Sequence, residues 1–338
     1  MSPDLVQPTP ERLFDTLNAF QRSASLKGAI DLDLFTAIGE GANTPQALAK
    51  RCSAAERGVR ILSDYLVTIG FLSKSGGKYA LTPDSAAFLD RRSPMCLASS
   101  SKFMLSPDHL DSFRDIAAVV RKGGPILGEE GMLVSENPQW VEFARSMAPL
   151  MALPAKLIAD LLDSQRLTPS RILDIAAGHG LFGIAIAKRN PHAQVVAVDW
   201  PNVLQVAREN AATAGLETRY GTIGGSAFDV DLGEGYDLAL ITNFLHHFDE
   251  AKCTGFLKKV HGALNRDGRV VVLEFVPNED RVSPPIPAQF ALIMLAGTPG
   301  GDAYTFAEFS RMLKTAGFGS SEIYPLLPSI QQVILARK

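Results

Sequence analysis

The stretch Arg171-Ile-Leu-Asp-Ile-Ala-Ala-Gly-His-Gly-Leu-Phe-Gly183 decides the fold, because an apolar run ends there in a glycine-rich turn. The apolar part, Arg171–Ala177, has the length and composition of a buried strand, and a predicted helix over Leu181–Asn190 follows it directly. Glycines in such a turn let the backbone bend sharply and approach a ligand. The stretch therefore predicts the first strand and helix of an α/β domain with a ligand-binding loop.

Further β-rich runs follow, separated by helical segments. They are Gln194–Trp200, Glu217–Ile223, Tyr236–Leu245 and Arg269–Val276. This alternation predicts a mostly parallel, Rossmann-like sheet with helices on both faces. The last two runs, Ser321–Leu327 and Gln331–Arg337, lie too close together for a helical crossover, so we expect an antiparallel hairpin at one edge of the sheet.

The front half of the chain is predicted to be a separate, mainly α domain over residues 1–160, followed by the α/β domain over 161–338. Thr44-Pro45 is typical of an N-cap with proline at the first helical position, and Ser53-Ala-Ala-Glu56 predicts a capping box at the start of the next helix. The stretch Phe71–Leu81, with paired glycines at its centre, indicates a short hairpin. Helix, helix and hairpin in this order is a winged-helix pattern.

Composition excludes several classes of protein. The 338 residues have a formal net charge of −3 and no long Lys/Arg block, which argues against nucleic acid as the main partner. The longest apolar stretches, such as Phe290–Gly297, are too short to span a bilayer, and the N-terminus lacks the apolar segment of a signal peptide. The 3 cysteines show no metal-ligand spacing. We therefore expect a cytoplasmic protein with no metal site and no membrane contact.

The glycine-rich turn leaves two kinds of cofactor open. Gly178, Gly180 and Gly183 fit the spacing G-x-G-x-x-G of dinucleotide sites, and Asp199, at the end of the second strand, can accept hydrogen bonds from the ribose of either cofactor. Asp174 lies in the strand just before the turn, where a pyrophosphate gains nothing from a negative charge. A zwitterionic sulfonium compound tolerates that charge, which favours S-adenosylmethionine.

Two segments resemble known enzymes. Asp174–Gly180 is similar to the Asp-x-Gly-x-Gly-x-Gly loop of class I methyltransferases, with Ala176 in place of the first glycine. Asp199-Trp-Pro-Asn-Val203 resembles the Asp-Leu-Pro-x-Val segment of the plant small-molecule, hydroxyindole and bacterial polyketide O-methyltransferases. The resemblance runs from about residue 15 to the C-terminus. It implies S-adenosylmethionine as cofactor, a phenolic or enolic small-molecule acceptor, and a homodimer formed through the N-terminal domain.

Polar residues at the strand ends are expected to meet at one edge of the sheet, because ligands bind outside the carboxyl ends of the strands in such folds. These residues are Asp174, Asp199, Ser226, His246 and Glu274. His247 follows His246 directly. Neighbouring side chains of an extended segment point in opposite directions, so we expect only one of the two histidines to face the ligand.

The resemblance assigns the roles at this edge. Phe244–Cys253 is similar to the Ile-Leu-His-Asp-Trp-Ser-Asp-Glu-x-Cys stretch of the same family, which places the catalytic base on His246 and the residue that orients it on Glu274. A neutral imidazole can take the proton of a phenol as the methyl group moves. The second acid that flanks the base in the family aligns with Ala303, next to Asp302, so this acid is missing.

The resemblance also implies the rest of the site. Gly224–Phe228 is similar to the family's Gly-Asp-Met-Phe adenine segment, with Ser226 in place of the acid, and Thr242 lies where the plant enzymes have lysine. The implied cofactor residues are Asp174, Gly178, Gly180, Asp199, Trp200, Ser226, Ala227, Phe228, Thr242 and Asn243.

Apolar stripes indicate where the acceptor binds. Trp140, Phe143, Met147 and Met151 form one stripe at helical spacing, and Phe290 with Met294 forms another. Such stripes also occur as plain core packing. Because the segment from Phe143 to Met147 resembles the family's Phe-Asn-x-x-Met helix, all of these except Trp140 are expected to line the acceptor pocket.

Two other functions remain open. A relative of this family can bind the cofactor yet methylate nitrogen or carbon, or act as a decarboxylase or pericyclase, and the missing acid at Ala303 keeps this open. A winged helix can also bind DNA, and Arg51, Arg57 and Arg60 are clustered, so a ligand-sensing regulator is the third hypothesis.

Overall fold

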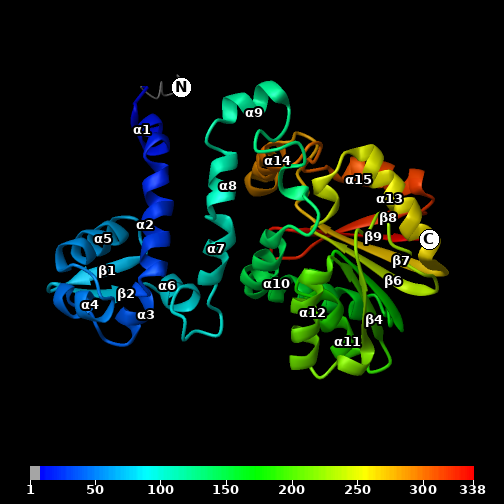
Figure 1. Cartoon of the computed structure of the whole chain (residues 1–338), viewed down its shortest axis with the longest axis horizontal. Helices are drawn as coiled ribbons and strands as arrows, with labels where there is room; N and C mark the ends of the chain where they lie inside the picture. The colour runs from blue at the N-terminus through cyan, green and yellow to red at the C-terminus, as the bar shows by residue number, and fades with distance from the viewer. Residues whose placement is uncertain (1–7) are drawn as a thin grey trace, which may run out of the picture. The chain divides into compact units, whose positions relative to one another are not determined.

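Figure 1 shows the computed structural model of the chain, which describes residues 8–338. The chain divides into two compact units between Leu105 and Ser106, earlier than the boundary at residue 160 that the sequence predicts. The difference arises from the long helix α10 (Pro138–Ser164). This helix packs against α11 (Leu181–Arg189) and α12 (Pro201–Thr213), so it belongs to the second unit.

The first unit is a small helical domain with one hairpin. Its helices are α1 (Glu11–Leu17), α2 (Ala19–Asp31), α3 (Leu34–Gly39), α4 (Pro45–Arg51), α5 (Glu56–Thr68), α6 (Pro83–Phe88), η1 (Ala98–Ser100) and α7 (Ser101–Met104). Strands β1 (Leu72–Ser75) and β2 (Lys78–Leu81) pair antiparallel. Phe35, Leu48 and Leu66 lie in its buried core. The predicted order of helix, helix and hairpin is confirmed.

One of the two predicted helix caps is correct. The Thr44 hydroxyl accepts a hydrogen bond from the Ala47 amide at 3.2 Å, as predicted. The capping box at Ser53 is wrong. Ser53 has a left-handed φ of 51°, and the Ala54 amide donates to the Ala49 carbonyl, so Ser53 ends α4 in a Schellman-type turn. Ala55, which has no side-chain acceptor, takes the N-cap position of α5.

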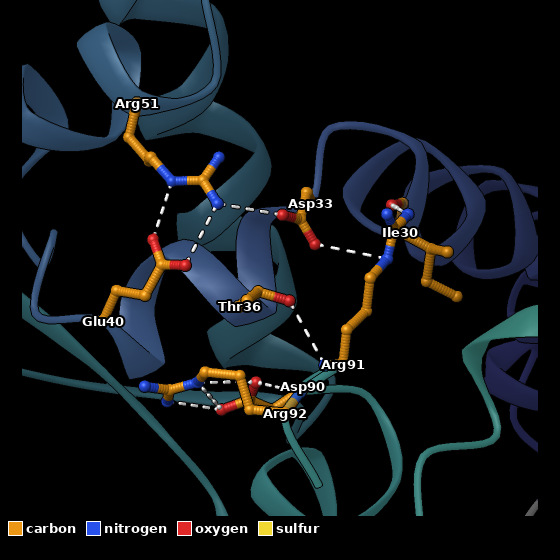
Figure 2. A network of polar contacts seen from close by, with 8 residues as sticks. All are labelled: Ile30, Asp33, Thr36, Glu40, Arg51, Asp90, Arg91 and Arg92. Atoms are coloured by element: carbon orange, nitrogen blue, oxygen red, sulfur yellow. Dashed lines mark hydrogen bonds and ion pairs between the residues drawn. The ribbon is translucent and has the colours of Figure 1, made fainter.

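A network of ion pairs fixes the turns of this unit, as Figure 2 shows. Arg51 lies between Glu40, at 2.7 Å, and Asp33, at 3.0 Å, and Asp33 also pairs with Arg91 at 3.3 Å. Arg60 pairs with Asp64 on the same helix. Two of the three clustered arginines are therefore paired with acidic neighbours, which weakens the basic face that DNA binding requires.

The second unit contains a seven-stranded sheet in the order β5-β4-β3-β6-β7-β9-β8. The strands are β3 (Arg171–Ile175), β4 (Gln194–Asp199), β5 (Tyr220–Gly224), β6 (Tyr236–Thr242), β7 (Leu264–Glu274), β8 (Ser321–Pro325) and β9 (Gln332–Arg337). The first five strands are parallel, and β9 is antiparallel to both β7 and β8. The α/β fold class is confirmed, including the antiparallel hairpin at one edge.

Helices cover both faces of this sheet, as Figure 1 shows. Alternate strand residues such as Leu238 and Leu240 pack with α10, α11 and α12. Their neighbours Ala239 and Ile241 face the other side, where α13 (Glu250–Ala263) and α15 (Phe306–Ala316) pack. The strand order reverses between β3 and β6, and ligands bind at such a switch point in open α/β sheets.

The remaining short elements of the second unit connect these layers. They are α8 (Pro107–Ser112), α9 (Ile116–Lys122), η2 (Gly131–Leu133), η3 (Glu217–Arg219), η4 (Leu245–His247) and α14 (Pro285–Gly297). Across residues 8–338, no helix is both long and apolar enough to cross a membrane.

Helix α15 begins with a complete capping box. The Thr305 hydroxyl accepts a hydrogen bond from the Glu308 amide, and the Glu308 carboxylate accepts one from the Thr305 amide at 2.8 Å. We expect Thr305→Ala to lower the free energy of unfolding by about 1 kcal/mol, because the cap acceptor is lost. Urea denaturation measures this change. Thr315→Ala, an exposed position in the same helix, is the control and should change stability by less than about 0.5 kcal/mol.

Candidate active site

The glycine-rich turn that follows β3 has a strained backbone. Ala176, Gly178 and Gly180 have φ angles of 50°, 55° and 73°. This region is left-handed, and it costs a residue with a Cβ atom roughly 1 kcal/mol or more. Ala176 therefore occupies a position that suits glycine. The replacement of the family's first glycine keeps the turn but places strain in it.

Asp199 is joined to this turn by hydrogen bonds. At the end of β4, its Oδ2 accepts from the Gly178 amide at 2.8 Å and its Oδ1 from the Trp200 amide at 2.7 Å. Burial raises the pKa of the Asp199 carboxyl to about 6, although the two amides lower it. Each carboxylate oxygen has a second lone pair, which leaves acceptor capacity for ribose hydroxyls.

Asp174 is the least satisfied acid at this edge. It is fully buried in β3, and its Oδ2 accepts from the Gly183 amide at 3.1 Å. Its Oδ1 has no hydrogen-bond partner among residues 8–338. Burial raises the pKa of Asp174 to about 7, and the negative Asp199 adds to this shift. An uncompensated carboxylate beside the turn fits a cationic ligand.

His246 and Glu274 form a buried pair. The Nδ1 of His246 lies 2.5 Å from Oε2 of Glu274, and both side chains are almost fully buried. The other carboxylate oxygen, Oε1, accepts from the amides of Phe244 at 3.1 Å and Leu245 at 3.0 Å, and more weakly from that of His246 at 3.4 Å. With the proton held on Nδ1, the Nε2 of His246 is the acceptor.

The two histidines do not point in opposite directions, so that expectation is wrong. Both belong to the 3-10 helix η4, and their ring centroids are 4.1 Å apart. A helical turn does not alternate side chains as an extended strand does. The Nδ1 of His247 lies 3.1 Å from the Phe244 carbonyl, and burial lowers the pKa of His247 well below its usual range. His247 is therefore a neutral neighbour of His246.

The segment that lacks the second acid contacts the backbone of His246. The Asp302 amide donates to the His246 carbonyl at 3.0 Å. A Cβ atom on Gly301 would lie 2.2 Å from that same carbonyl oxygen, so only glycine fits there. The Asp302 carboxylate pairs with Arg281 at 3.1 Å, and Ala303 is buried. The backbone of Asp302 thus bonds to His246, whereas its side chain bonds to Arg281.

Aromatic rings surround the histidines. Phe290 of α14 meets His246 edge to face at 4.7 Å, and Trp140 of α10 meets His247 at 5.5 Å and Phe143 at 5.9 Å. Of the predicted acceptor residues, Phe290 thus contacts the histidine pair directly. Phe143 reaches it through the ring of Trp140.

The three predicted methionines are buried, and one of them contacts the site. The sulfur of Met151 accepts a weak hydrogen bond from the side-chain amide of Asn243, with 3.7 Å between Nδ2 and the sulfur. Met147 and Met294 are also buried, which fits core packing as well as a pocket wall. Thr242 is buried at the end of β6.

Three residues near the site were not predicted. The side-chain amide of Gln331, in the segment before β9, donates to Asn243 Oδ1. Tyr220 of β5 is buried, its hydroxyl has no partner in the described part of the chain, and a Cβ atom on Gly180 would meet that hydroxyl at 2.4 Å. Lys259 of α13 donates to the carbonyls of Ala227 and Phe228, in the predicted adenine segment, and of Val230 just after it. Only the long-range packing of the sheet brings these residues here, and no local motif marks them.

His179 lies inside the turn and is buried. Burial lowers its pKa to about 4, so its imidazole is neutral at physiological pH. Its Nδ1 accepts from the Leu181 amide at 3.2 Å. Within the described residues, no group of three or more His, Cys, Asp or Glu side chains is placed to hold a metal ion.

Comparison with known proteins identifies the family. The sequence matches the family model of the O-methyltransferase domain over residues 131–319 and that of the O-methyltransferase dimerisation domain over residues 14–91. The chain therefore belongs to the O-methyltransferase family.

Individual relatives agree with this assignment. A solved structure from Nostoc punctiforme, assigned to the O-methyltransferases, is 51% identical, with a TM-score of 0.96 over 98% of this chain and 100% of that chain. Human N-acetylserotonin methyltransferase in complex with S-adenosylmethionine has the same fold, at 24% identity and a TM-score of 0.85 over 99% of both chains. The 3-hydroxy-5-methyl-1-naphthoate 3-O-methyltransferase of Streptomyces sahachiroi is 27% identical over 310 residues, 91% of this chain and 89% of that protein. The chain is an S-adenosylmethionine-dependent O-methyltransferase.

The acids of the turn predict a pH dependence of cofactor binding. Asp174 and Asp199 have pKa values of about 7 and about 6 in the ligand-free protein. A cationic ligand favours their deprotonated forms, so binding releases protons below these values and affinity rises with pH. We expect S-adenosylmethionine to bind roughly 10-fold or more tightly at about pH 8 than at about pH 5.5, as measured by calorimetry. S-adenosylhomocysteine, which carries the same ribose and the same α-amino group, should show a similar slope. Equal affinity at both pH values would contradict a contact between these two acids and the cofactor.

Proposed function

We propose that this protein transfers the methyl group of S-adenosylmethionine to a hydroxyl of a phenolic or enolic small molecule, with His246 as general base and Glu274 as the residue that orients it. The observation that carries this proposal is the buried pair in which His246 Nδ1 lies 2.5 Å from Glu274. The polyketide and hydroxyindole O-methyltransferases among the relatives act on compounds of this kind, by their names.

The chemistry explains why this pair is needed. The cofactor supplies an electrophilic methyl group, so the protein has to align the acceptor and remove its proton. A phenol with a pKa near 10 is mostly protonated at neutral pH. The Nε2 of His246 accepts that proton, and the negative Glu274 stabilises the imidazolium that forms. Because Glu274 also holds the backbone of residues 244–246, the imidazole does not need to reorient during the reaction.

The cofactor would be held along the carboxyl edge of the strands. Asp199 accepts hydrogen bonds from the ribose, and Asp174 with the turn around Gly178 and Gly180 receives the amino-acid part. The segment Ser226–Phe228 binds the adenine. The unpartnered Oδ1 of Asp174 supports this arrangement, because it needs a donor that the described residues do not provide.

A carbon acceptor is the second candidate. An L-tyrosine C(3)-methyltransferase of Streptomyces lavendulae is 26% identical over 308 residues, and Ala303 of this chain lacks the second acid expected beside the base. Mass spectrometry of the product distinguishes the two, because an O-methyl ether and a C-methyl phenol fragment differently.

The base is tested by substitution. We expect His246→Ala to lower kcat by about 10²–10⁴-fold while the Kd for S-adenosylmethionine stays within about twofold, because the imidazole acts on the acceptor proton. Glu274→Gln should cause a smaller loss, since it keeps the shape but not the charge. A screen of phenolic acceptors with a radiolabelled methyl donor measures turnover. His192→Gln, on an exposed loop, is the control, and unchanged turnover in His246→Ala would refute the role of the base.

We propose in addition that the first unit forms a homodimer. Four apolar side chains of α1 and α2 are between 57% and 68% exposed: Leu13, Phe14, Leu17 and Phe20. Three of these lie within the segment that matches the dimerisation domain, residues 14–91. Apolar surface of this kind is covered in stable assemblies.

Charges on this surface should separate the subunits. We expect the double variant Leu17→Asp, Phe20→Asp to behave as a monomer in light scattering, whereas the wild type has the mass of a dimer, because burying two carboxylates in an apolar contact is unfavourable. Leu327→Asp, at a position 78% exposed in the other unit, is the control and should remain dimeric. A dimer that persists in the double variant would place the interface elsewhere.

A further inference from the structure

Lys259 lies on α13, and its ammonium group donates hydrogen bonds to backbone carbonyls of another segment. Its Nζ donates to the carbonyl oxygens of Ala227 at 3.1 Å, Phe228 at 2.7 Å and Val230 at 2.6 Å. An ammonium group has three N–H donors, so these three bonds use all of them. The lysine is therefore committed to the segment that follows β5.

That segment is a single helical turn with a defined polarity. The Ser226 carbonyl accepts from the amides of Asp229 at 2.9 Å and Val230 at 3.0 Å. The carbonyl groups at the carboxyl end of such a turn lack donor partners within it, and its first amides lack acceptor partners. Lys259 compensates the carbonyl end. The amides of Ala227 and Phe228 lie at the other end, where they can donate to a ligand.

The side chain of Phe228 attaches the same turn to α13 a second time. The Phe228 ring packs against Phe256 of α13 at 4.9 Å and against Phe248 at 4.8 Å. The ammonium of Lys252, also on α13, lies 4.8 Å from the centroid of the Phe228 ring. The turn is thus held through the ring of Phe228 and through its carbonyl groups, and Lys259 is the residue of α13 that bonds to its backbone in the described part of the chain.

A charged donor stabilises this arrangement more than a neutral one does. Three carbonyl oxygens within about 3 Å of one centre repel each other unless a cation lies between them, and hydrogen bonds from a charged donor are stronger than neutral ones. Without the ammonium the turn would open to let water reach these oxygens. The amides at its other end would then lose their fixed direction.

We propose that Lys259 is a positioning residue for the adenine ring of the cofactor. It acts through the turn of residues 226–230, whose amides donate to the adenine nitrogen acceptors, and it does not touch the cofactor itself. This inference rests on the proposed contact between Ser226–Phe228 and the adenine. It predicts that loss of Lys259 weakens recognition of the base while the chemistry at His246 is kept.

The experiment compares two ligands in matched variants. S-adenosylhomocysteine offers an acceptor at N1 of its adenine, whereas S-inosylhomocysteine carries a hydrogen there and cannot accept. We expect the wild type to bind the adenine compound at least roughly 10-fold more tightly, about the value of one well-placed hydrogen bond. In Lys259→Met, the affinity for S-adenosylhomocysteine should fall by roughly 10-fold or more and approach that for the inosine compound. The KM for S-adenosylmethionine should rise with little change in kcat.

Two further variants control the result. Lys258→Met changes the exposed neighbouring lysine and should bind both ligands as the wild type does. Lys259→Gln keeps a neutral donor, so we expect intermediate affinity and discrimination, and it provides the test if Lys259→Met does not fold. Circular dichroism and thermal melting establish that each variant is folded.

The outcomes separate this inference from the proposed cofactor contact. If the wild type discriminates between the two ligands, but a folded Lys259 variant keeps both the affinity and the discrimination, the role of Lys259 is refuted while the adenine contact stands. If the wild type binds both ligands equally, the adenine contact itself is wrong, and the proposal for Lys259 falls with it. Loss of affinity with unchanged discrimination would also overturn the proposal, because it would show a general loss of structure.

Discussion

The Glu274 carboxylate is the interaction on which the active site depends. A buried charge is costly unless it is compensated, and here the amides of Phe244, Leu245 and His246 and the imidazole of His246 provide the donors. One charge therefore fixes the end of β6, the path of η4 and the tautomer of His246. The Asp302 amide and the close approach of Gly301 hold the same backbone from the opposite side.

The part of the sheet edge where we propose that the cofactor binds is organised differently. Asp174 receives one amide, its second oxygen is unpartnered in the described part of the chain, and its pKa is raised to about 7. Ala176 adds left-handed strain to the turn beside it. All the oxygens of the Glu274 carboxylate thus have donors within the described residues, while one oxygen of Asp174 does not.

Sequence patterns failed where a residue served a different neighbour from the expected one. Ser53 fits a capping box, but it is needed to end α4, and a left-handed residue there cannot also be the N-cap of α5. The pair His246-His247 follows a strand, and extended geometry was the natural assumption, but the amides that bond to Glu274 turn the chain into a 3-10 helix. The long helix α10 follows a helical front half in sequence, yet its apolar face packs on the sheet.

The sequence alone determined the order of the strands along the chain, the parallel sheet with its antiparallel edge, the glycine turn and the residues expected at the strand ends. These follow from local periodicity and from the residue types that turns require. Only the tertiary structure decided which side chains form long-range hydrogen bonds. Examples are the bond of Gln331 to Asn243 and that of Lys259 to the turn after β5. Hydrogen bonds of this kind join residues far apart in the chain, and their formation depends on packing that no local pattern encodes.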